Sequence, residues 1–311
     1  MAVKLQKPPF VFFRGKLRSW DEASLHISTE AVVRGLNVFE GLKAYWQADG
    51  SIGIVAVERH WRRLRRSARL LHIPFDMTLE EFDARCHELV AKLCRPDSDI
   101  WVRATLYVVD GHWGEGTVSD LVLTAYHQPK VTPEPLDIGV STWRRSSDLA
   151  LPTRIKTSAN YLVARLGKIE GRSRGYGEMV VLNQAGRVAE ALGCCVMIVR
   201  DGVVSTPPAS EGALESITVD IVEALARSMG VPFERRPVDR SELYIADEMA
   251  LVGTLVEVTP VRSIDGLAFP PGGPVVSSLM RRYFAAVRGE DPHDAADLSC
   301  RRVRAEAPAL V

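Results

Sequence analysis

The chain has 311 residues, of which 46% are hydrophobic and 25% charged, the composition of an ordinary globular protein with a sizeable core. Lys plus Arg equals Asp plus Glu at 39 each, and this zero net charge argues against binding of nucleic acid through bulk charge. No apolar run approaches the roughly 20 residues that span a bilayer. We therefore expect neither nucleic acid nor a membrane as a partner.

The cysteine pattern favours a reducing compartment. The five cysteines are Cys86, Cys94, Cys194, Cys195 and Cys300. Their odd number and scattered spacing fit neither a disulfide framework nor a zinc site. The histidines are also too scattered to suggest a metal site. We expect a cytoplasmic protein without a bound metal ion.

Two hairpins and two helices are predicted in the first third of the chain. Gly15 and the turn at residues 48–50 mark the hairpins. The first helix ends before Pro74, and the second begins at a capping box formed by Thr78 and Glu81. The apolar stripe of the first helix consists of Trp61, Leu64, Ala68 and Leu71.

A proline-rich stretch follows two predicted strands and indicates a domain boundary. β-branched and aromatic residues predict strands over residues 100–109 and 121–126. The next residues, 128–138, carry three prolines and little apolar content, which is typical of a linker. The prediction is a smaller N-terminal α/β domain over residues 1–127 and a larger C-terminal domain over residues 139–311.

The C-terminal part also mixes strands, hairpins and helices. Asp201-Gly202 predicts a tight hairpin, and Gly230 ends a helix. Strands are expected over 138–143, 179–182, 187–190, 196–200, 203–205, 249–252 and 256–258, and helices over 158–172 and 218–229. The whole chain is therefore predicted to be of mixed α/β class.

Arg63 differs from the other arginines of its helix. At about 100° per residue it falls on the flank of the apolar stripe, beside Leu64 and on the side of His60 and Ser67. A guanidinium at the edge of a core requires an anionic partner. That partner is either a phosphate or carboxylate ligand, or a carboxylate of the protein in a structural salt bridge.

Lys156 follows an apolar, strand-like approach and precedes three small residues. A partly desolvated lysine in such a place has a lowered pKa and becomes a nucleophile suited to Schiff-base chemistry. The alternative is an ordinary lysine whose ammonium group extends to water.

Glu190 lies in alternating register with Val188. If Val188 points inward, so does Glu190, and a buried carboxylate needs a cationic or N–H partner. A protonated pyridine nitrogen or an arginine would serve.

Two segments suggest an anion site. The backbone N–H groups of Ile217 and Thr218 open a predicted helix, and a helix N-terminus can bind phosphate. Gly253 allows close approach of the backbone to a ligand, and Thr254 offers a hydroxyl. The alternative is simple capping and turn chemistry, which is the favoured explanation for each segment taken alone.

Taken in order, these segments resemble the branched-chain amino acid aminotransferases, which are fold-type IV enzymes that depend on pyridoxal 5'-phosphate. The resemblance runs from about Phe12 to about Phe284. It is carried by VFEGLKAY, HWRRLRRSA, WVRATLYVVDG, KTSANYL, GRVAEALG, DGVVSTPP, LESIT and SELYIADEMALVGTLVEVTPVRSIDG. It implies the two-domain, D-amino acid aminotransferase-like fold (mixed α+β) and a homodimer in which the second subunit reaches the site.

The resemblance also implies roles for individual residues at the cofactor. Lys156 corresponds to the lysine that bonds to the cofactor and shuttles the α-proton, and Glu190 to the carboxylate paired with the pyridine nitrogen. Tyr161 corresponds to the tyrosine at the phenolic oxygen, and Arg63 to the phosphate arginine. The rest of the phosphate site corresponds to Ile217, Thr218, Gly253 and Thr254.

The substrate side departs from the family pattern. Phe39 and Arg103 match, and the backbone at Thr254 and Leu255 would receive the substrate α-carboxylate. Arg34 and Trp101 stand where tyrosines are expected. Further departures are Ala191, Cys194, Cys195, Ser216, Val219, Leu255 and Val256. Because the cofactor groups are kept and the substrate groups changed, the resemblance implies an altered pocket, and Arg34 suggests an acidic or unusual substrate.

The leading hypothesis is an aminotransferase that moves an amino group between an amino acid and a 2-keto acid, with a role in specialised biosynthesis. A second hypothesis is a lyase of the same fold, similar to aminodeoxychorismate lyase, which eliminates pyruvate. A third is a non-catalytic binding protein that keeps the fold. Lys156 argues against the third, because an inactive site has no chemical need for a lysine there.

Overall fold

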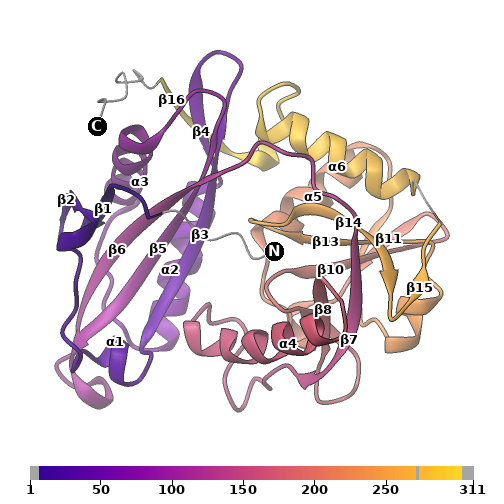
Figure 1. Ribbon diagram of the computed structural model, residues 1–311, viewed down its shortest axis with the longest axis horizontal. Helices are drawn as coiled ribbons and strands as arrows, with labels where there is room; N and C mark the ends of the chain where they lie inside the picture. The colour runs from indigo at the N-terminus through magenta and orange to yellow at the C-terminus, as the bar shows by residue number, and fades with distance from the viewer. Residues whose placement is uncertain (1–6, 271–272, 303–311) are drawn as a thin grey trace. The chain divides into compact units, whose positions relative to one another are not determined.

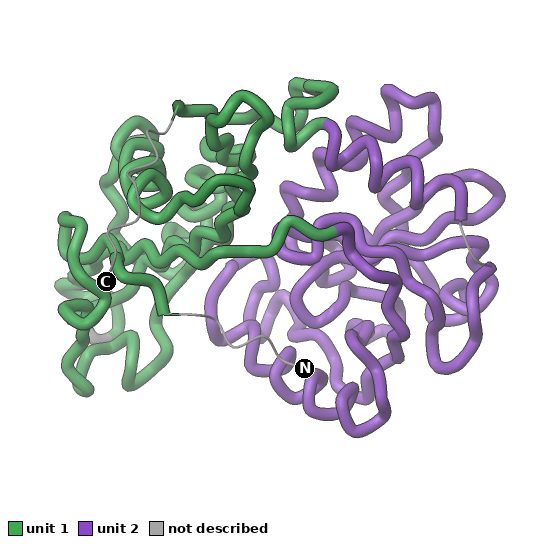
Figure 2. Tube along the Cα trace, turned by 45° about the horizontal axis from the view of Figure 1, so that its top comes forward, with its two compact units in different colours: residues 1–131, 286–311 green, residues 132–285 purple. Residues whose placement is uncertain are grey.

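The computed structural model describes residues 7–270 and 273–302, and its contacts divide the chain into two compact units (Figure 2). Unit 1 comprises Met1–Val131 and Ala286–Val311, and unit 2 comprises Thr132–Ala285. The division falls inside the predicted linker. The prediction that the C-terminal domain extends to residue 311 is corrected, because the described residues after Ala285 group with unit 1.

Unit 1 contains, within its described residues, a seven-stranded antiparallel sheet of order β16-β4-β3-β5-β6-β1-β2. Its helices are α1 (Glu30–Val33), α2 (Val57–Leu70) and α3 (Leu79–Leu93). Helices α2 and α3 cover one face of the sheet (Figure 1). The strands are β1 (Phe10–Phe13), β2 (Lys16–Ser19), β3 (Asn37–Trp46), β4 (Ser51–Val55), β5 (Asp99–Asp110), β6 (Val118–Gln128) and β16 (Leu298–Arg302).

The C-terminal strand β16 explains why the end of the chain joins unit 1. It pairs antiparallel with β4, from Leu298 opposite Val55 to Arg302 opposite Ser51. The sequence did not predict this strand, because its pairing partner lies more than 240 residues away and its own residues are mostly polar. Backbone pairing with β4, rather than side-chain periodicity, therefore defines it.

Helix α2 shows the predicted division between a buried and a solvent face. Leu64 and Ala68 are fully buried, and Arg63 is buried on the same side as His60 and Ser67. In the stripe predicted for this helix, Trp61 and Leu71 are only partly buried. The capping box predicted at Thr78 and Glu81 is confirmed at the start of α3.

Unit 2 has, in its described part, a nine-stranded sheet with the path β12-β11-β10-β13-β14-β7-β8-β9, to which β15 adds at β14. Its helices are α4 (Leu162–Ser173), α5 (Ile217–Ser228) and α6 (Pro274–Val287). The strands are β7 (Leu136–Arg144), β8 (Glu178–Leu182), β9 (Val188–Ala191), β10 (Cys195–Arg200), β11 (Val203–Thr206), β12 (Phe233–Arg235), β13 (Glu248–Gly253), β14 (Glu257–Ile264) and β15 (Leu267–Ala268). Parallel pairing joins β11 with β12 and β7 with both β8 and β14.

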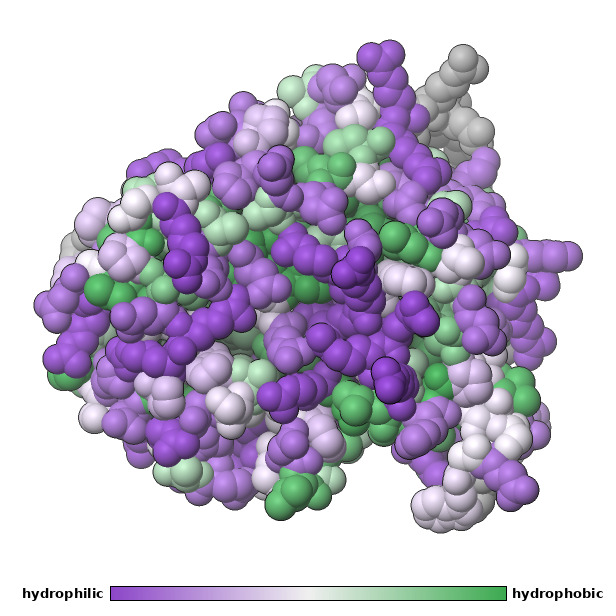
Figure 3. Space-filling model, turned by 180° about the vertical axis from the view of Figure 1, so that it is seen from behind, coloured by the Kyte–Doolittle hydropathy of each residue, from purple (hydrophilic) through white to green (hydrophobic). Residues whose placement is uncertain are grey.

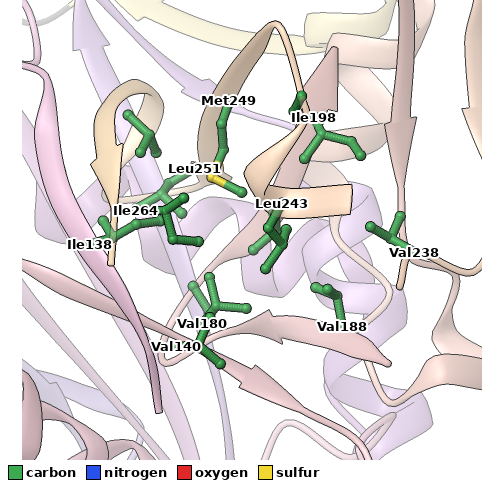
Figure 4. Packing of buried hydrophobic residues seen from close by; sticks show 14 of the residues in the cluster. Ile138, Val140, Val180, Val188, Ile198, Val238, Leu243, Met249, Leu251 and Ile264 are labelled. Carbon is green, nitrogen blue, oxygen red and sulfur yellow. The ribbon is translucent and has the colours of Figure 1, made fainter. Parts of the chain in front are cut away.

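A continuous apolar core supports the sheet of unit 2. Strand residues such as Ile138, Val180 and Leu251 pack with Leu243 from the 3-10 helix Arg240–Tyr244, which precedes β13 (Figure 4). On the other side, the small residues of α4 lie against β8 and the segment after β9. A Cβ at Gly167 would meet the side chain of Leu192 at 2.5 Å, which shows how closely this helix packs.

The predicted helix over residues 158–172 begins differently from expectation. Its first turn is a 3-10 helix, η3 (Ser158–Tyr161), and the α-helix α4 begins at Leu162. The tighter first turn places Tyr161 at the junction of the two helices, directly after the segment that carries Lys156.

None of the helices within residues 7–270 and 273–302 combines the length and apolar character needed to cross a membrane. On the face seen in Figure 3, small apolar groups are scattered among hydrophilic side chains.

Candidate active site

Lys156 lies between β7 and η3. The preceding carbonyl group, that of Ile155, accepts a hydrogen bond from the buried side-chain amide of Asn160. Lys156 Nζ donates a hydrogen bond to the hydroxyl of Tyr161 at 2.9 Å. The neighbouring Ile155 and Thr157 are buried. The lysine amine is thus hydrogen-bonded to a phenol five residues along the chain, and the cofactor roles of both residues stay predictions.

Glu190 is buried on β9, as its alternation with Val188 predicted. Its Oε1 lies 2.8 Å from Nη2 of Arg145, and its Oε2 accepts a hydrogen bond from the backbone N–H of Leu214 at 2.9 Å. Burial raises the pKa of Glu190 above its ordinary value, although Arg145, the Leu214 N–H and Lys156 oppose that rise. The carboxylate is therefore a good partner for an additional proton or cation.

The residues predicted for an anion site lie on two neighbouring elements of unit 2. Ile217 and Thr218 lie in the first turn of α5, where backbone N–H groups lack intrahelical acceptors. Helix α5 packs against β13, the strand that ends at Gly253 immediately before Thr254. The helix N-terminus favours an anion through its dipole.

Gly253 packs closely against Cys194. A Cβ at this position would lie 3.1 Å from Cβ of Cys194. Leu255, two residues on, is 46% exposed. A side chain at position 253 would therefore make a tight contact with Cys194, whereas Leu255 is partly open to solvent.

Arg63 has the carboxylate partner that the sequence left open. On α2, its Nε and Nη2 lie 2.7 and 2.8 Å from the two oxygens of Glu40 on β3. His60 Nδ1 is 2.6 Å from the same carboxylate. Burial alone would raise the pKa of Glu40, but the attraction of Arg63, with a smaller part from His60, holds it far below its usual range. The structure thus shows the salt bridge, and a phosphate role for Arg63 stays a prediction.

Phe39, Trp101 and Arg103 lie together on the opposite face of the same sheet. In the register of β3 and β5, Gly41 is opposite Arg103 and Phe39 is opposite Thr105. The Arg103 guanidinium carbon is 3.8 Å from the ring centroid of Phe39, and its Nε donates to Thr105 Oγ1 at 3.3 Å. These residues form an aromatic surface with one cation on it.

Gly41 provides the space for Trp101 on this surface. A Cβ at Gly41 would lie 2.9 Å from the indole nitrogen of Trp101, which is stacked on Tyr126 with centroids 5.5 Å apart. We expect Gly41→Ala to lower the free energy of unfolding by about 1–3 kcal/mol, because the indole must leave its stacked position. Urea unfolding followed by tryptophan fluorescence measures this. Gly193→Ala is the control, since a Cβ there meets no heavy atom within 4 Å, and equal losses in both variants would contradict the prediction.

Arg34, whose charge suggested an acidic or unusual substrate, lies beside a carboxylate and an aromatic ring. Its guanidinium lies 2.7 Å from the carboxylate of Glu30 and 5.7 Å from the ring of Trp113. The Glu30 carboxylate therefore offsets the charge of Arg34, and a role of Arg34 at a substrate stays a prediction.

The comparisons with known proteins agree with this arrangement. A family model, amino-transferase class IV, matches residues 37–264. The chain belongs to the class IV aminotransferases. This aminotransferase depends on pyridoxal 5'-phosphate, as its family membership and its structural neighbours show.

The relatives of this class IV aminotransferase match it over nearly their full length. A probable branched-chain-amino-acid aminotransferase of Aquifex aeolicus is 34% identical over 290 residues, covering 90% of this chain and 93% of the relative. The branched-chain-amino-acid aminotransferase of Salmonella typhimurium is 31% identical over 296 residues, covering 92% and 95%.

Solved structures of branched-chain aminotransferases match this chain with similar sequence identity and coverage. The branched-chain aminotransferase of Thermoproteus uzoniensis with norvaline has a TM-score of 0.88 at 30% identity, with 94% of this chain and 98% of that chain covered. The PLP form of the branched-chain amino acid aminotransferase of Thermobaculum terrenum has a TM-score of 0.86 at 34% identity, with 95% and 99% covered. The fold-type IV assignment is confirmed.

The side chains of unit 2 fit the chemistry of pyridoxal 5'-phosphate. Lys156 provides a primary amine, and Glu190 provides a buried carboxylate that two donors already hold in place. The first turn of α5 provides N–H groups for a phosphate. In the described part of the chain, no group of three His, Cys, Asp or Glu residues could hold a metal ion.

Glu40, Arg145 and Asn160, which contact the predicted residues or their neighbours, were not predicted from the sequence. Glu40 follows Phe39 in β3, so the two side chains point to opposite faces of the sheet. That alternation could have predicted that Glu40 faces the helices. Arg145 is buried beside the exposed Arg144, and only the end of β7 between them distinguishes the two. Nothing in the sequence marks the contacts of Asn160, which depend on the conformation of the loop before it.

Proposed function

We propose that the enzyme transfers an amino group between an apolar or aromatic 2-amino acid and an acidic 2-keto acid, in the manner of the branched-chain aminotransferases. The hydrogen bond between Lys156 and Tyr161, with Glu190 held nearby in the same unit, is the observation that carries the proposal. The aromatic surface of Phe39 and Trp101 suits an apolar substrate side chain. Arg103, also on that surface, suits a carboxylate.

In this proposal, different residues transfer the proton, orient the amine, protonate the cofactor ring and bind its phosphate. When bound, pyridoxal 5'-phosphate supplies a ring that accepts the electron pair left by the α-proton. Lys156 Nζ removes that proton from the amino acid and later returns it, while the Tyr161 hydroxyl orients Nζ. Glu190 holds a proton at the ring nitrogen. The N–H groups of Ile217 and Thr218, with Thr254, hold the phosphate.

The first experiment is the absorbance spectrum of the purified protein with pyridoxal 5'-phosphate, before and after excess amino donor without acceptor. A panel beginning with L-leucine and L-glutamate covers both substrate classes. We expect the visible band of the lysine-bound cofactor to be replaced by the near-ultraviolet band of pyridoxamine phosphate. A visible band that persists while pyruvate accumulates would instead support the lyase, and absence of any visible band would contradict the role of Lys156.

We further propose that the enzyme is a homodimer, and that α4 contributes to the contact between subunits. Leu162, Leu166 and Ile169 follow one another at helical spacing and are each more than a third exposed. The opposite side of α4, with Ala164 and Gly167, is buried against its own unit. An exposed apolar stripe of this kind is typical of an interaction surface.

Leu166→Glu tests the dimer. Burying one leucine contributes about 1.5–3 kcal/mol, so we expect the dimer dissociation constant to rise by about 10–100-fold, because 1.4 kcal/mol corresponds to a tenfold change. Analytical ultracentrifugation over a concentration series measures it. Leu267→Glu places the same charge on another exposed leucine, on β15, and should leave the association unchanged. A monomeric wild-type protein, or equal effects of both variants, would overturn the assignment of α4.

A cytoplasmic location is also part of the proposal. All five cysteines are free thiols, and Cys86, Cys194 and Cys195 are buried. A reducing compartment preserves that state.

A further inference from the structure

One buried arginine connects Glu190 with the segment that carries Lys156. Arg145 is 5% exposed, and its Nη2 lies 2.8 Å from Oε1 of Glu190. Its Nη1 donates to the carbonyl oxygen of Asn160 at 3.0 Å, and its Nε donates to the carbonyl oxygen of Gly212 at 3.4 Å. Three nitrogens of a single guanidinium therefore hold acceptors from three separate segments.

Asn160 extends this connection to the lysine segment. Its side-chain amide donates to the carbonyl oxygens of Pro152 at 3.0 Å and Ile155 at 2.9 Å. Ile155 directly precedes Lys156, and Asn160 directly precedes Tyr161, whose hydroxyl accepts from the lysine. The position of the amine and the position of the Glu190 carboxylate are thus linked through Arg145.

Arg145 is also the main positive charge acting on Glu190. Among the described residues, Arg145 and Lys156 are the charged groups that lower the pKa of Glu190. The charge of Glu190 in turn contributes to raising the pKa of the Cys194 thiol. Burial raises the pKa of Glu190, and Arg145 opposes that rise more than the Leu214 N–H or Lys156 does. In the proposed function the Lys156 amine transfers the substrate proton, so it cannot also serve as the permanent counter-ion of Glu190.

We propose that Arg145 is a positioning residue that keeps the Glu190 carboxylate ionised and fixes it relative to residues 152–156. The inference rests on the proposed function, because it matters only where Glu190 must remain an anion to hold a proton on the ring nitrogen. A lysine could supply the charge, but its single ammonium group lacks the planar set of donors that reaches three acceptors at once.

The first test uses the protein without cofactor, so that its result does not depend on aminotransfer. The carboxyl carbons of glutamate are labelled with 13C, and Glu190→Gln identifies the resonance of Glu190. We expect Arg145→Met to raise the pKa of Glu190 by about 1–3 units, the usual effect of an adjacent opposite charge. Arg145→Lys should raise it less. Arg144→Met, which removes the exposed neighbouring guanidinium, should not change it, and equal titration in R145M and R144M would overturn the proposal.

The second test uses the loaded enzyme and the pH dependence of the half-reaction. Activity that needs ionised Glu190 is lost as the pH falls through the pKa of that group, so R145M should move the acidic limb upward by the shift found in the first test. Arg145→Lys should leave the acidic limb close to its wild-type pH. In a Glu190→Gln background R145M should have little further effect, and this double variant leaves no unpaired charge in the core.

The two tests separate the possible failures. If R145M raises the pKa of Glu190 but leaves the acidic limb unmoved, the pairing holds and the role of Glu190 in the proposed function fails. If R145M slows the E190Q enzyme as strongly as the wild type, Arg145 does not act through Glu190 and the inference is wrong.

Discussion

Lys156→Ala is expected to eliminate the visible absorbance of the bound cofactor and to slow the half-reaction with an amino donor by at least about 10²–10⁴-fold, the range that a positioned acid–base group contributes. The reason lies in the local geometry. Lys156 Nζ lies 2.9 Å from the Tyr161 hydroxyl, which holds the amine in place, and a phenol cannot itself form the bond to the cofactor. Single-turnover absorbance measurements with a saturating donor give the rate.

Two controls separate the loss of chemistry from the loss of structure. Lys130→Ala removes an exposed lysine that pairs with Asp97 in unit 1, and should leave both the spectrum and the rate unchanged. Adding a small primary amine such as methylamine to K156A should restore part of the rate, because it replaces the missing base. A K156A variant with an intact visible band and a wild-type rate would show that another residue carries the reaction.

Tyr161→Phe should produce a smaller change than K156A. The lysine remains, but its amine loses the acceptor that orients it. The order of effects, with K156A far below Y161F, distinguishes a proton-transferring group from the group that positions it.

The residues of the site differ in how far the sequence could predict them. Lys156 and Tyr161 are five residues apart on one local turn, so their proximity follows from the chain itself. The burial of Arg63 also followed from a local pattern, the rotation of about 100° per residue along α2. Its partner Glu40 lies 23 residues away on β3, and no periodicity specifies which strand residue will face a given helix residue.

The same distinction applies to the fold. Strands with alternating or β-branched sequences, such as β5 and β6, were predicted within a few residues. The short strands β12 and β15 have too few residues to show a period, and β16 depends on pairing with β4 across the whole chain. Long-range backbone pairing, which sequence patterns do not encode, accounts for the corrected C-terminal boundary.

The buried pair of Glu40 and Arg63 predicts a large loss of stability. Glu40→Gln keeps the shape of the side chain but removes the negative charge that the buried Arg63 guanidinium contacts at 2.7 and 2.8 Å. Breaking such a pair from one side costs about 3–5 kcal/mol, a large part of the roughly 5–15 kcal/mol that stabilises a typical domain. Urea unfolding at neutral pH, followed by fluorescence and circular dichroism, measures the loss.

A matched control exists on the same helix. Glu58 and Arg62 form an exposed ion pair one turn apart, and Glu58→Gln should cost about 1 kcal/mol or less because water screens both groups. Replacing Glu40 and Arg63 together by leucine should recover most of the stability lost in E40Q, since no buried charge then remains. Equal losses in E40Q and E58Q would contradict the assignment.

The pH dependence gives a second, independent signature of this pair. The pKa of Glu40 is lower in the folded protein than in the unfolded chain, mainly because Arg63 and His60 outweigh its burial. The stabilisation is therefore complete above the unfolded pKa of about 4.3, and is lost as the pH falls through the lower folded value. The gap in stability between wild type and E40Q should consequently narrow below about pH 4. A gap that stays constant from neutral pH down to about pH 3 would mean that the amide introduced by E40Q disturbs packing rather than charge.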